Sequence, residues 1–132
     1  MLVSLIFAAA VAASHGRCLK YEPSVVHLRG RIVERWDYGP PGYGEDPKHD
    51  SREDFLVLKL EKPICVDGAL GDDFNSESEA DVPELMMVPP QGPRLPRRRA
   101  LVTGTLFHAI TAHHRTRVLI EVTGAQSLKA SK

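Results

Sequence analysis

The sequence predicts a mainly β domain, built as a small five-stranded barrel of the OB type. Three observations support this prediction. No strongly periodic helical segment occurs in the 132 residues. A long alternating run, Ser24–Asp37, is interrupted by Gly30, and two aliphatic runs, Ala100–Phe107 and Arg117–Val122, flank a polar segment. A long bent strand, two short strands, an interruption and a closing hairpin follow the OB-fold order, with an SH3-like barrel or an open β-sandwich as alternatives.

The first half of the chain is expected to supply three strands. In Ser24–Asp37 the residues Val26, Leu28 and Ile32 share one parity, and the glycine within this run indicates a bulge or a sharp bend. Residues 38–54 hold three glycines, three prolines and five acidic residues, which predicts a long loop. The next elements are a strand at Phe55–Leu60, a turn at Glu61–Pro63 and a strand at Ile64–Val66.

The second half is expected to close the barrel with a hairpin. Residues 67–83 form an acidic loop, and Leu85–Val88 is a brief strand or cap. Four prolines within residues 89–96 argue against a helix. The two aliphatic runs, Ala100–Phe107 and Arg117–Val122, then pair with each other. We therefore predict a single domain over residues 18–123, followed by a flexible polar tail over residues 124–132.

The charge composition excludes an overall field that would attract nucleic acid. Lysine plus arginine and aspartate plus glutamate number 17 each. Locally, residues 67–84 contain seven acidic residues and no lysine or arginine, and Arg94 and Arg97–Arg99 follow as a basic cluster. This pattern is typical of a solvated acidic loop followed by an exposed basic turn. No nucleic-acid partner is expected.

The N-terminal segment predicts export. Leu2–Ala13 is an unbroken run of apolar and small residues, too short to cross a bilayer as a helix of about 20 residues. Val11 and Ala13 supply small residues at the −3 and −1 positions for cleavage before Ser14, although no lysine or arginine precedes the run. We predict a signal peptide over residues 1–13, a periplasmic or secreted location, and no transmembrane anchor in the mature chain.

The two cysteines, Cys18 and Cys65, are predicted to form a structural disulfide. An even cysteine count in an oxidising compartment makes a disulfide the default. The residues lie 47 positions apart, and the loop-entropy model gives ~4 kcal/mol for closing such a loop.

Three motifs carry a resemblance to a known family. They are CLKYEPSVVHLRGRIVER near the start, PICVDG in the middle and VTGTLFHAITAHHRTRVLIEV near the end. Together they resemble a family of small exported bacterial proteins described only as a domain of unknown function (DUF4431-like). The chain departs from the pattern at Pro89–Arg99, where a more helix-compatible segment is expected. The resemblance implies an exported, disulfide-bonded, barrel-like domain, and it implies no activity.

An aromatic and cationic surface is the leading candidate for ligand binding. The OB-fold brings the loop after its first strand beside the loop between its last two strands. Here these loops are residues 36–54 and 108–117, and their candidate ligand-binding residues are Trp36, Tyr38, Tyr43, His113, His114, Arg115 and Arg117. Stacking rings beside cationic donors suit a sugar, a nucleotide base or an acidic peptide, and the expected partner is a small ligand, a glycan or an envelope protein. The structural alternative is that Trp36 packs into one end of the barrel and closes it, and that the tyrosines order the proline- and glycine-rich loop by packing against it.

A second candidate is a metal site at His108, His113 and His114. If Ala109–Ala112 forms a four-residue hairpin loop, His108 and His113 face each other with Cβ atoms ~5 Å apart. Two imidazoles at that separation can bind zinc, copper or nickel, with His114 or a loop carboxylate as a further ligand. Histidines at a hairpin mouth are otherwise hydrogen-bonded or solvated. No cofactor other than such a divalent transition metal is expected.

The remaining patterns point away from calcium and from catalysis. The acidic run from Asp72 to Asp81 is rich in oxygen ligands but lacks the glycine and glutamate spacing of an EF-hand. No spacing of serine, histidine and aspartate selects a triad, and no phosphate-binding glycine loop occurs. The sequence therefore predicts a non-enzymatic binding module of unknown ligand. An inhibitor or immunity-type partner of a secreted protein is the further alternative.

Overall fold

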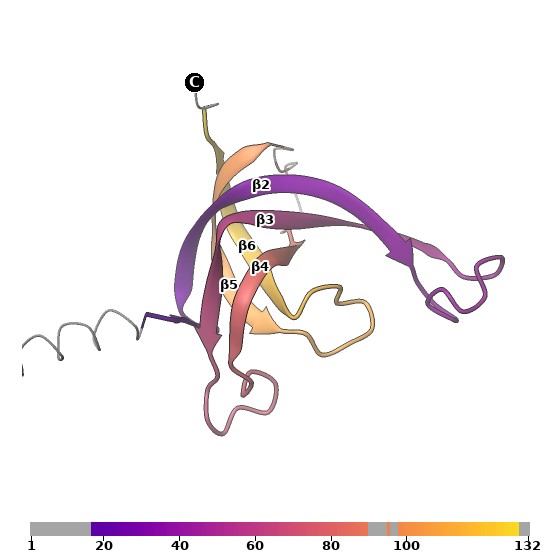
Figure 1. Cartoon of the computed structure of the whole chain (residues 1–132), viewed down its shortest axis with the longest axis horizontal. Coiled ribbons are helices and arrows are strands. Elements are labelled where there is room, and N and C mark those ends of the chain that lie inside the picture. Colours follow the sequence, from indigo (N-terminus) through magenta and orange to yellow (C-terminus); the bar gives the residue numbers. More distant parts are fainter. Residues whose placement is uncertain (1–16, 90–94, 96–97, 130–132) are drawn as a thin grey trace, which may run out of the picture.

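Six strands and no helix form in the part of the chain that the computed structural model describes, residues 17–89, 95 and 98–129. The strands are β1 (Leu19–Lys20), β2 (Val25–Tyr38), β3 (Arg52–Asp67), β4 (Glu79–Val88), β5 (Arg99–His108) and β6 (Val118–Ser127) (Figure 1). The predicted signal peptide lies outside these residues. Within the described ranges no helix is long and apolar enough to cross a membrane. The predicted mainly β class is confirmed.

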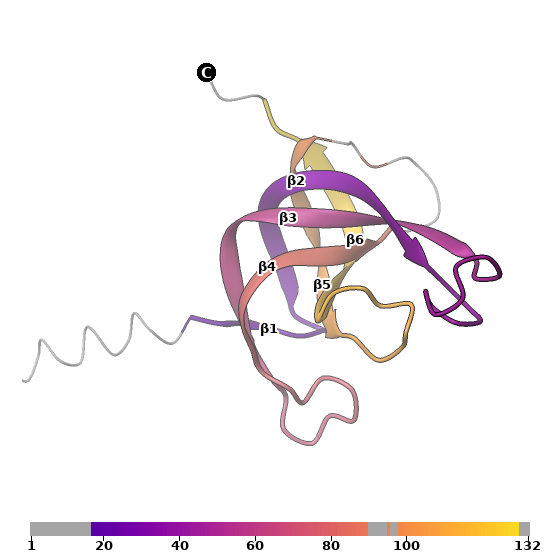
Figure 2. The same ribbon diagram turned by 45° about the vertical axis from the view of Figure 1, so that its right-hand side comes forward.

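Five of the strands close into a ring. The order is β3-β2-β5-β6-β4, and β4 pairs back to β3. Pairing between β4 and β6 is parallel, and every other pair in the ring is antiparallel. Strand β1 lies outside the ring, parallel to β3. This is the order expected for the OB-like barrel, and the ends of β2 and β3 continue beyond the ring as a projecting hairpin (Figures 1 and 2).

Glycines in two strands allow close approach of the backbones at the points where the sheet bends. Gly30 pairs with both Leu60 of β3 and Ala100 of β5, so β2 changes neighbour at this residue. A Cβ atom there would lie against the carbonyl oxygen of Lys59. At Gly104 the pairing with β6 shifts register, and a Cβ would meet the carbonyl oxygen of Glu121. The predicted bend at a mid-strand glycine is therefore present in β2 and has a counterpart in β5.

Several strand boundaries differ from the predicted ones. The turn expected at Glu61–Pro63 is wrong, because β3 runs unbroken from Arg52 to Asp67, with irregular pairing to β4 between Lys59 and Ile64 and between Ile64 and Val66. Strand β4 begins at Glu79 inside the expected acidic loop. Strand β6 continues through Gly124 to Ser127, into the segment assigned to the tail.

Aliphatic side chains fill the ring, and a second apolar row lies on its outside. The buried interior includes Val26, Ile32, Leu58, Val66, Val82, Leu85, Met87, Val102, Leu106, Ile120 and Val122. The outer row crosses the sheet through Val33, Val57, Met86, Leu119 and Phe107. Val57 and Leu119 are fully buried. The loop between β5 and β6 contacts this row, since the Arg115 amide donates to the Met86 sulfur at 3.4 Å and the His114 ring meets Phe107 edge-on at 5.6 Å.

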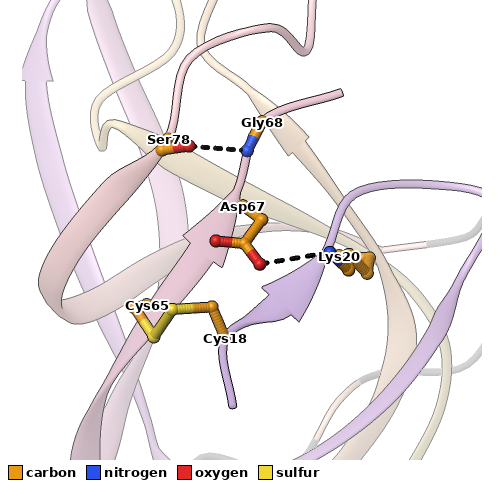
Figure 3. Close-up of a disulfide and its surroundings, with 6 residues drawn as sticks. All are labelled: Cys18, Lys20, Cys65, Asp67, Gly68 and Ser78. Atoms are coloured by element: carbon orange, nitrogen blue, oxygen red, sulfur yellow. Dashed lines mark hydrogen bonds and ion pairs between the residues drawn. A yellow bond between two sulfur atoms is a disulfide. The ribbon is translucent and has the colours of Figure 1, made fainter. Parts of the chain in front are cut away.

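The predicted disulfide is present between Cys18 and Cys65, with an S–S distance of 2.04 Å (Figure 3). It fixes the start of the described chain to β3. Beside it, Lys20 Nζ donates to Asp67 Oδ2 at 3.1 Å. Disulfides persist in oxidising compartments, so this bond is compatible with the predicted export.

Candidate functional site

The two loops singled out in the sequence are in contact through Glu53. We call residues 36–54 the arm and residues 109–117 the β5–β6 loop; the two lie on the same side of the ring (Figure 2). The Glu53 carboxylate lies 2.7 Å from His113 Nδ1 and accepts from Arg115 Nη2 at 2.6 Å. Arg115 Nη2 also donates to the Tyr38 carbonyl at 2.8 Å. Two of the predicted surface residues, His113 and Arg115, are therefore joined by one carboxylate that the sequence did not single out, and Arg115 connects them to Tyr38.

Tyr43 and Asp50 fix the tip of the arm. The Tyr43 hydroxyl lies 3.3 Å from His113 Nε2, and its ring lies 5.7 Å from the Arg115 guanidinium carbon. Asp50 accepts backbone N–H groups of Gly42, Gly44 and Asp46 at 2.6, 2.7 and 3.0 Å. A carboxylate that receives several backbone donors orders a loop rich in glycine and proline. The long predicted loop is therefore a structured tip.

The contact around Glu53 is electrostatically satisfied from within the chain. The hydrogen bond from His113 is the largest influence that lowers the pKa of Glu53, and the Arg115 guanidinium lowers it further against the effect of desolvation. The Arg115 side chain is only 12% exposed. Tyr43, His113 and Arg115 hold the arm against the β5–β6 loop through these contacts, while Arg115 Nε is buried without a hydrogen-bond partner among the described residues.

Trp36 presents a different surface on the same arm. Its side chain is 47% exposed, the Arg52 guanidinium lies over its ring at 4.6 Å, and the Tyr38 ring meets it edge-on at 5.2 Å. A surface hollow of about 390 Å³ is lined by Glu34, Arg35, Trp36, Arg52 and Asp54. Arg35 is anchored by a bidentate pair with Glu84 at 2.6 and 2.9 Å. Trp36 does not plug the barrel end, which corrects the structural alternative for this residue.

Two predicted surface residues have other roles. His114 Nδ1 accepts the backbone N–H of Ile110 at 2.9 Å, and desolvation with the nearby His113 lowers the pKa of His114. Arg117 Nη1 donates to Glu79 Oε1 at 2.7 Å and to the Ala80 carbonyl at 3.3 Å. His114 therefore stabilises the β5–β6 loop, and Arg117 belongs to a separate polar cluster.

The three-histidine metal site is not formed. His108 pairs with Val118, so the connection is residues 109–117 and His108 does not face His113 as a four-residue loop would require. Instead His108 Nε2 lies 2.7 Å from Glu79 Oε2 and 3.3 Å from Glu77 Oε2. Across residues 17–89, 95 and 98–129, this is the one group of three potential ligands whose donor atoms lie within 4.8 Å of one another.

Charge and hydrogen bonding make this cluster strongly polar. Desolvation alone would lower the pKa of His108, but the hydrogen bonds with Glu79 and the Ala109 carbonyl outweigh it and raise the pKa above its usual value. The bond to His108 likewise lowers the pKa of Glu79, with Arg117 adding to the effect against desolvation. Burial, with Glu79 and Glu77 nearby, raises the pKa of Tyr21 to about 12, so its hydroxyl stays a donor to the Glu77 carbonyl.

Residues 85–126 match the family described as Domain of unknown function (DUF4431). No curated protein and no solved structure matches the chain. The DUF4431-like segment runs from the middle of β4 to the end of β6, and it includes the closing hairpin with His108, His113 and Arg115. The family resemblance predicted from the sequence is supported over this segment.

The carboxylates that complete both clusters precede the DUF4431-like segment, and the sequence did not assign them to these clusters. Glu53 lies in the arm, Glu77 precedes β4 and Glu79 begins it. The acidic run was visible in the sequence as a poor calcium loop. Only the pairing of β4 and of β5 with β6 shows that two of its members meet a histidine.

Proposed function

We propose that this protein is an exported, non-enzymatic binding module that recognises an oligosaccharide at the hollow around Trp36. The observation that supports this proposal most directly is the chain's single tryptophan, half-exposed within a hollow lined by two arginines and two carboxylates. Large aromatic side chains are usually mostly buried, so an exposed ring on a projecting hairpin is consistent with recognition.

The chemistry of the hollow suits a neutral sugar better than a polyanion. An indole face packs on the apolar face of a pyranose ring, while carboxylates accept from sugar hydroxyls and guanidinium groups donate to them. The lining charges, Glu34 and Asp54 against Arg35 and Arg52, balance in sign. OB-folds bind oligosaccharides with this part of the fold, which lends the proposal a fold-level analogy.

The side chains around the hollow favour binding over turnover. Asp54 is paired with Arg52 at 3.1 Å, and Glu84 is paired with Arg35. A glycosidase needs one carboxyl group that is held protonated as a general acid. The hydrogen bond from Arg35 instead lowers the pKa of Glu84 and so favours its charged form.

Trp36 itself provides the test, because the chain's only tryptophan reports directly on the site. Soluble N-acetylglucosamine oligomers and muropeptides are titrated into the disulfide-bonded protein while its tryptophan emission is recorded. We expect a saturable change in emission for at least one of them, and calorimetry should show that binding falls at least about tenfold in Trp36→Ala and in Arg52→Ala.

Phe74 supplies the matched control, since it is an exposed aromatic residue in the loop between β3 and β4 and outside the arm. Phe74→Ala should bind as the wild type does. No change in emission with either class of oligosaccharide would refute the proposal, as would equal losses in Phe74→Ala and Trp36→Ala.

An envelope protein is the second candidate ligand for the same arm. Tryptophan, tyrosine and arginine are the residues most enriched in interface hot spots, and Trp36, Tyr38 and Arg52 lie together here. A pull-down from envelope extract with wild-type and Trp36→Ala protein tests this candidate. A partner retained only by the wild type would identify an inhibitor or immunity-type role, and identical sets of retained proteins would exclude it.

A further inference from the structure

We infer that Glu77, Glu79 and His108 form a binding site for a divalent transition metal, with zinc as the first candidate. The three side chains come from different elements, since Glu77 precedes β4, Glu79 begins it and His108 ends β5. Their donor atoms lie within 4.8 Å of one another. Ligand atoms around a tetrahedral zinc ion lie roughly 3.3 Å apart.

The orientation of His108 directs its Nε2 atom towards the two carboxylates. Its Nδ1 lies 3.0 Å from the Ala109 carbonyl oxygen, which can only accept, so this nitrogen carries a proton. In the neutral ring the Nε2 lone pair then points at Glu79 Oε2, 2.7 Å away, which is also an acceptor. At this distance the two atoms share a proton, and a metal ion would replace that proton with a small outward shift of the side chains to roughly 3.3 Å between ligand atoms. Metal-binding histidines commonly show this arrangement, in which the second nitrogen donates to a backbone carbonyl.

The Glu79 carboxylate, and the backbones of Glu77 and His108, are held by further contacts. The Glu77 carbonyl accepts the buried Tyr21 hydroxyl at 2.7 Å. The second oxygen of Glu79 accepts from Arg117 at 2.7 Å, and the His108 amide donates to Asn75 Oδ1 at 2.9 Å. Asn75 is the one buried polar side chain among residues 17–89, 95 and 98–129. Ligands fixed in this way lose little conformational freedom when they bind an ion.

The donor set selects the class of metal, and the exposure of Glu77 gives the ion access. One imidazole nitrogen with two carboxylate oxygens suits zinc and other first-row transition metals, whereas calcium and magnesium prefer oxygen ligands alone. His108 and Glu79 are only 15% and 14% exposed, but Glu77 is 73% exposed. Three protein ligands leave a fourth position for water.

The test is calorimetric titration of zinc chloride into the untagged, disulfide-bonded chain near neutral pH. We expect one equivalent of zinc to bind with micromolar or tighter affinity, and excess calcium not to displace it. His108→Ala should abolish binding. Glu77→Gln, a change at a largely exposed side chain that leaves the fold intact, should weaken it by at least about tenfold.

Two control variants separate this site from adventitious binding. Glu121→Gln alters an exposed glutamate of β6 outside the cluster, and His113→Ala removes the histidine paired with Glu53. Both should bind zinc as the wild type does. The inference is overturned if micromolar zinc does not bind, if Glu77→Gln binds as tightly as the wild type, if calcium displaces zinc, or if His113→Ala rather than His108→Ala loses the ion. Trp36→Ala should retain zinc, so this result is separable from the oligosaccharide proposal.

Discussion

At the scale of single side chains, Glu53 joins two loops that are far apart in the sequence. Its carboxylate meets both His113 and Arg115, and its pKa is lowered by these partners. A carboxyl group with a lowered pKa stabilises the folded contact above its unfolded pKa of about 4.3, and this contribution is lost as the pH falls through the lower folded value. The arm should therefore loosen in acid.

Limited proteolysis of the arm measures this effect. In the wild type, cleavage within residues 39–51 by an acid-active protease should rise steeply as the pH falls below about 4.3. Glu53→Gln cannot form the charged contact. In this variant the backbone amides of the arm should therefore exchange rapidly with solvent already at pH 7, as measured by hydrogen–deuterium exchange. Arm amides that exchange equally slowly in both proteins at pH 7 would rule out this role for Glu53.

At the scale of elements, β2 and the closing hairpin could be predicted because their sequence patterns are local. Apolar residues of β2 alternate up to a glycine, and that glycine lies where β2 passes from β5 to β3. The N-terminal half of β4 could not be predicted, because the buried Val82 is flanked by the exposed Asp81 and Pro83 within an acidic run. Pro63 is tolerated in β3 because it falls where the pairing with β4 changes register, so its missing N–H costs no regular ladder bond.

The candidate sites were less predictable than the strands, because each depends on the register between distant strands. The contact between the arm and the β5–β6 loop follows from the OB order, so Tyr43 and His113 could be placed together from the sequence. The partner of His108 could not, because a shorter hairpin would have opposed it to His113, whereas the structure pairs it with Val118.

Alanine substitutions at two glycines of the closing hairpin, Gly104 and Gly124, should differ in their effect on stability. At Gly104 a Cβ would clash with the Glu121 backbone carbonyl, which cannot move without breaking the ladder. Gly104→Ala should lower the free energy of unfolding by about 2–3 kcal/mol in urea denaturation. Gly124→Ala, where no atom lies within 4 Å of the added Cβ, should change it by less than about 0.5 kcal/mol. Equal effects of the two substitutions would contradict the assigned bulge.

At the scale of the whole molecule, the disulfide fixes the N-terminal segment to the ring across 47 residues of sequence. Replacing both cysteines with alanine should lower the free energy of unfolding by up to about 4 kcal/mol, since the unfolded chain gains the entropy of an open loop. Urea denaturation of the Cys18→Ala, Cys65→Ala protein checks this, with reduced wild type as the control. A loss below about 1 kcal/mol would show that the bond contributes little to stability.

Closure of the ring by parallel pairing of β4 and β6 is the structural claim on which the Glu77, Glu79 and His108 cluster depends. It places the β5–β6 loop over the outer apolar row and brings Arg117, the last residue of that loop, to Glu79 of β4. The most direct measurement is a nuclear Overhauser spectrum of the isotope-labelled protein. We predict backbone cross-peaks in a parallel pattern between Met86–Val88 and Leu119–Glu121. Their absence, or an antiparallel pattern between these strands, would contradict the closed ring and the position of the Glu77, Glu79 and His108 cluster.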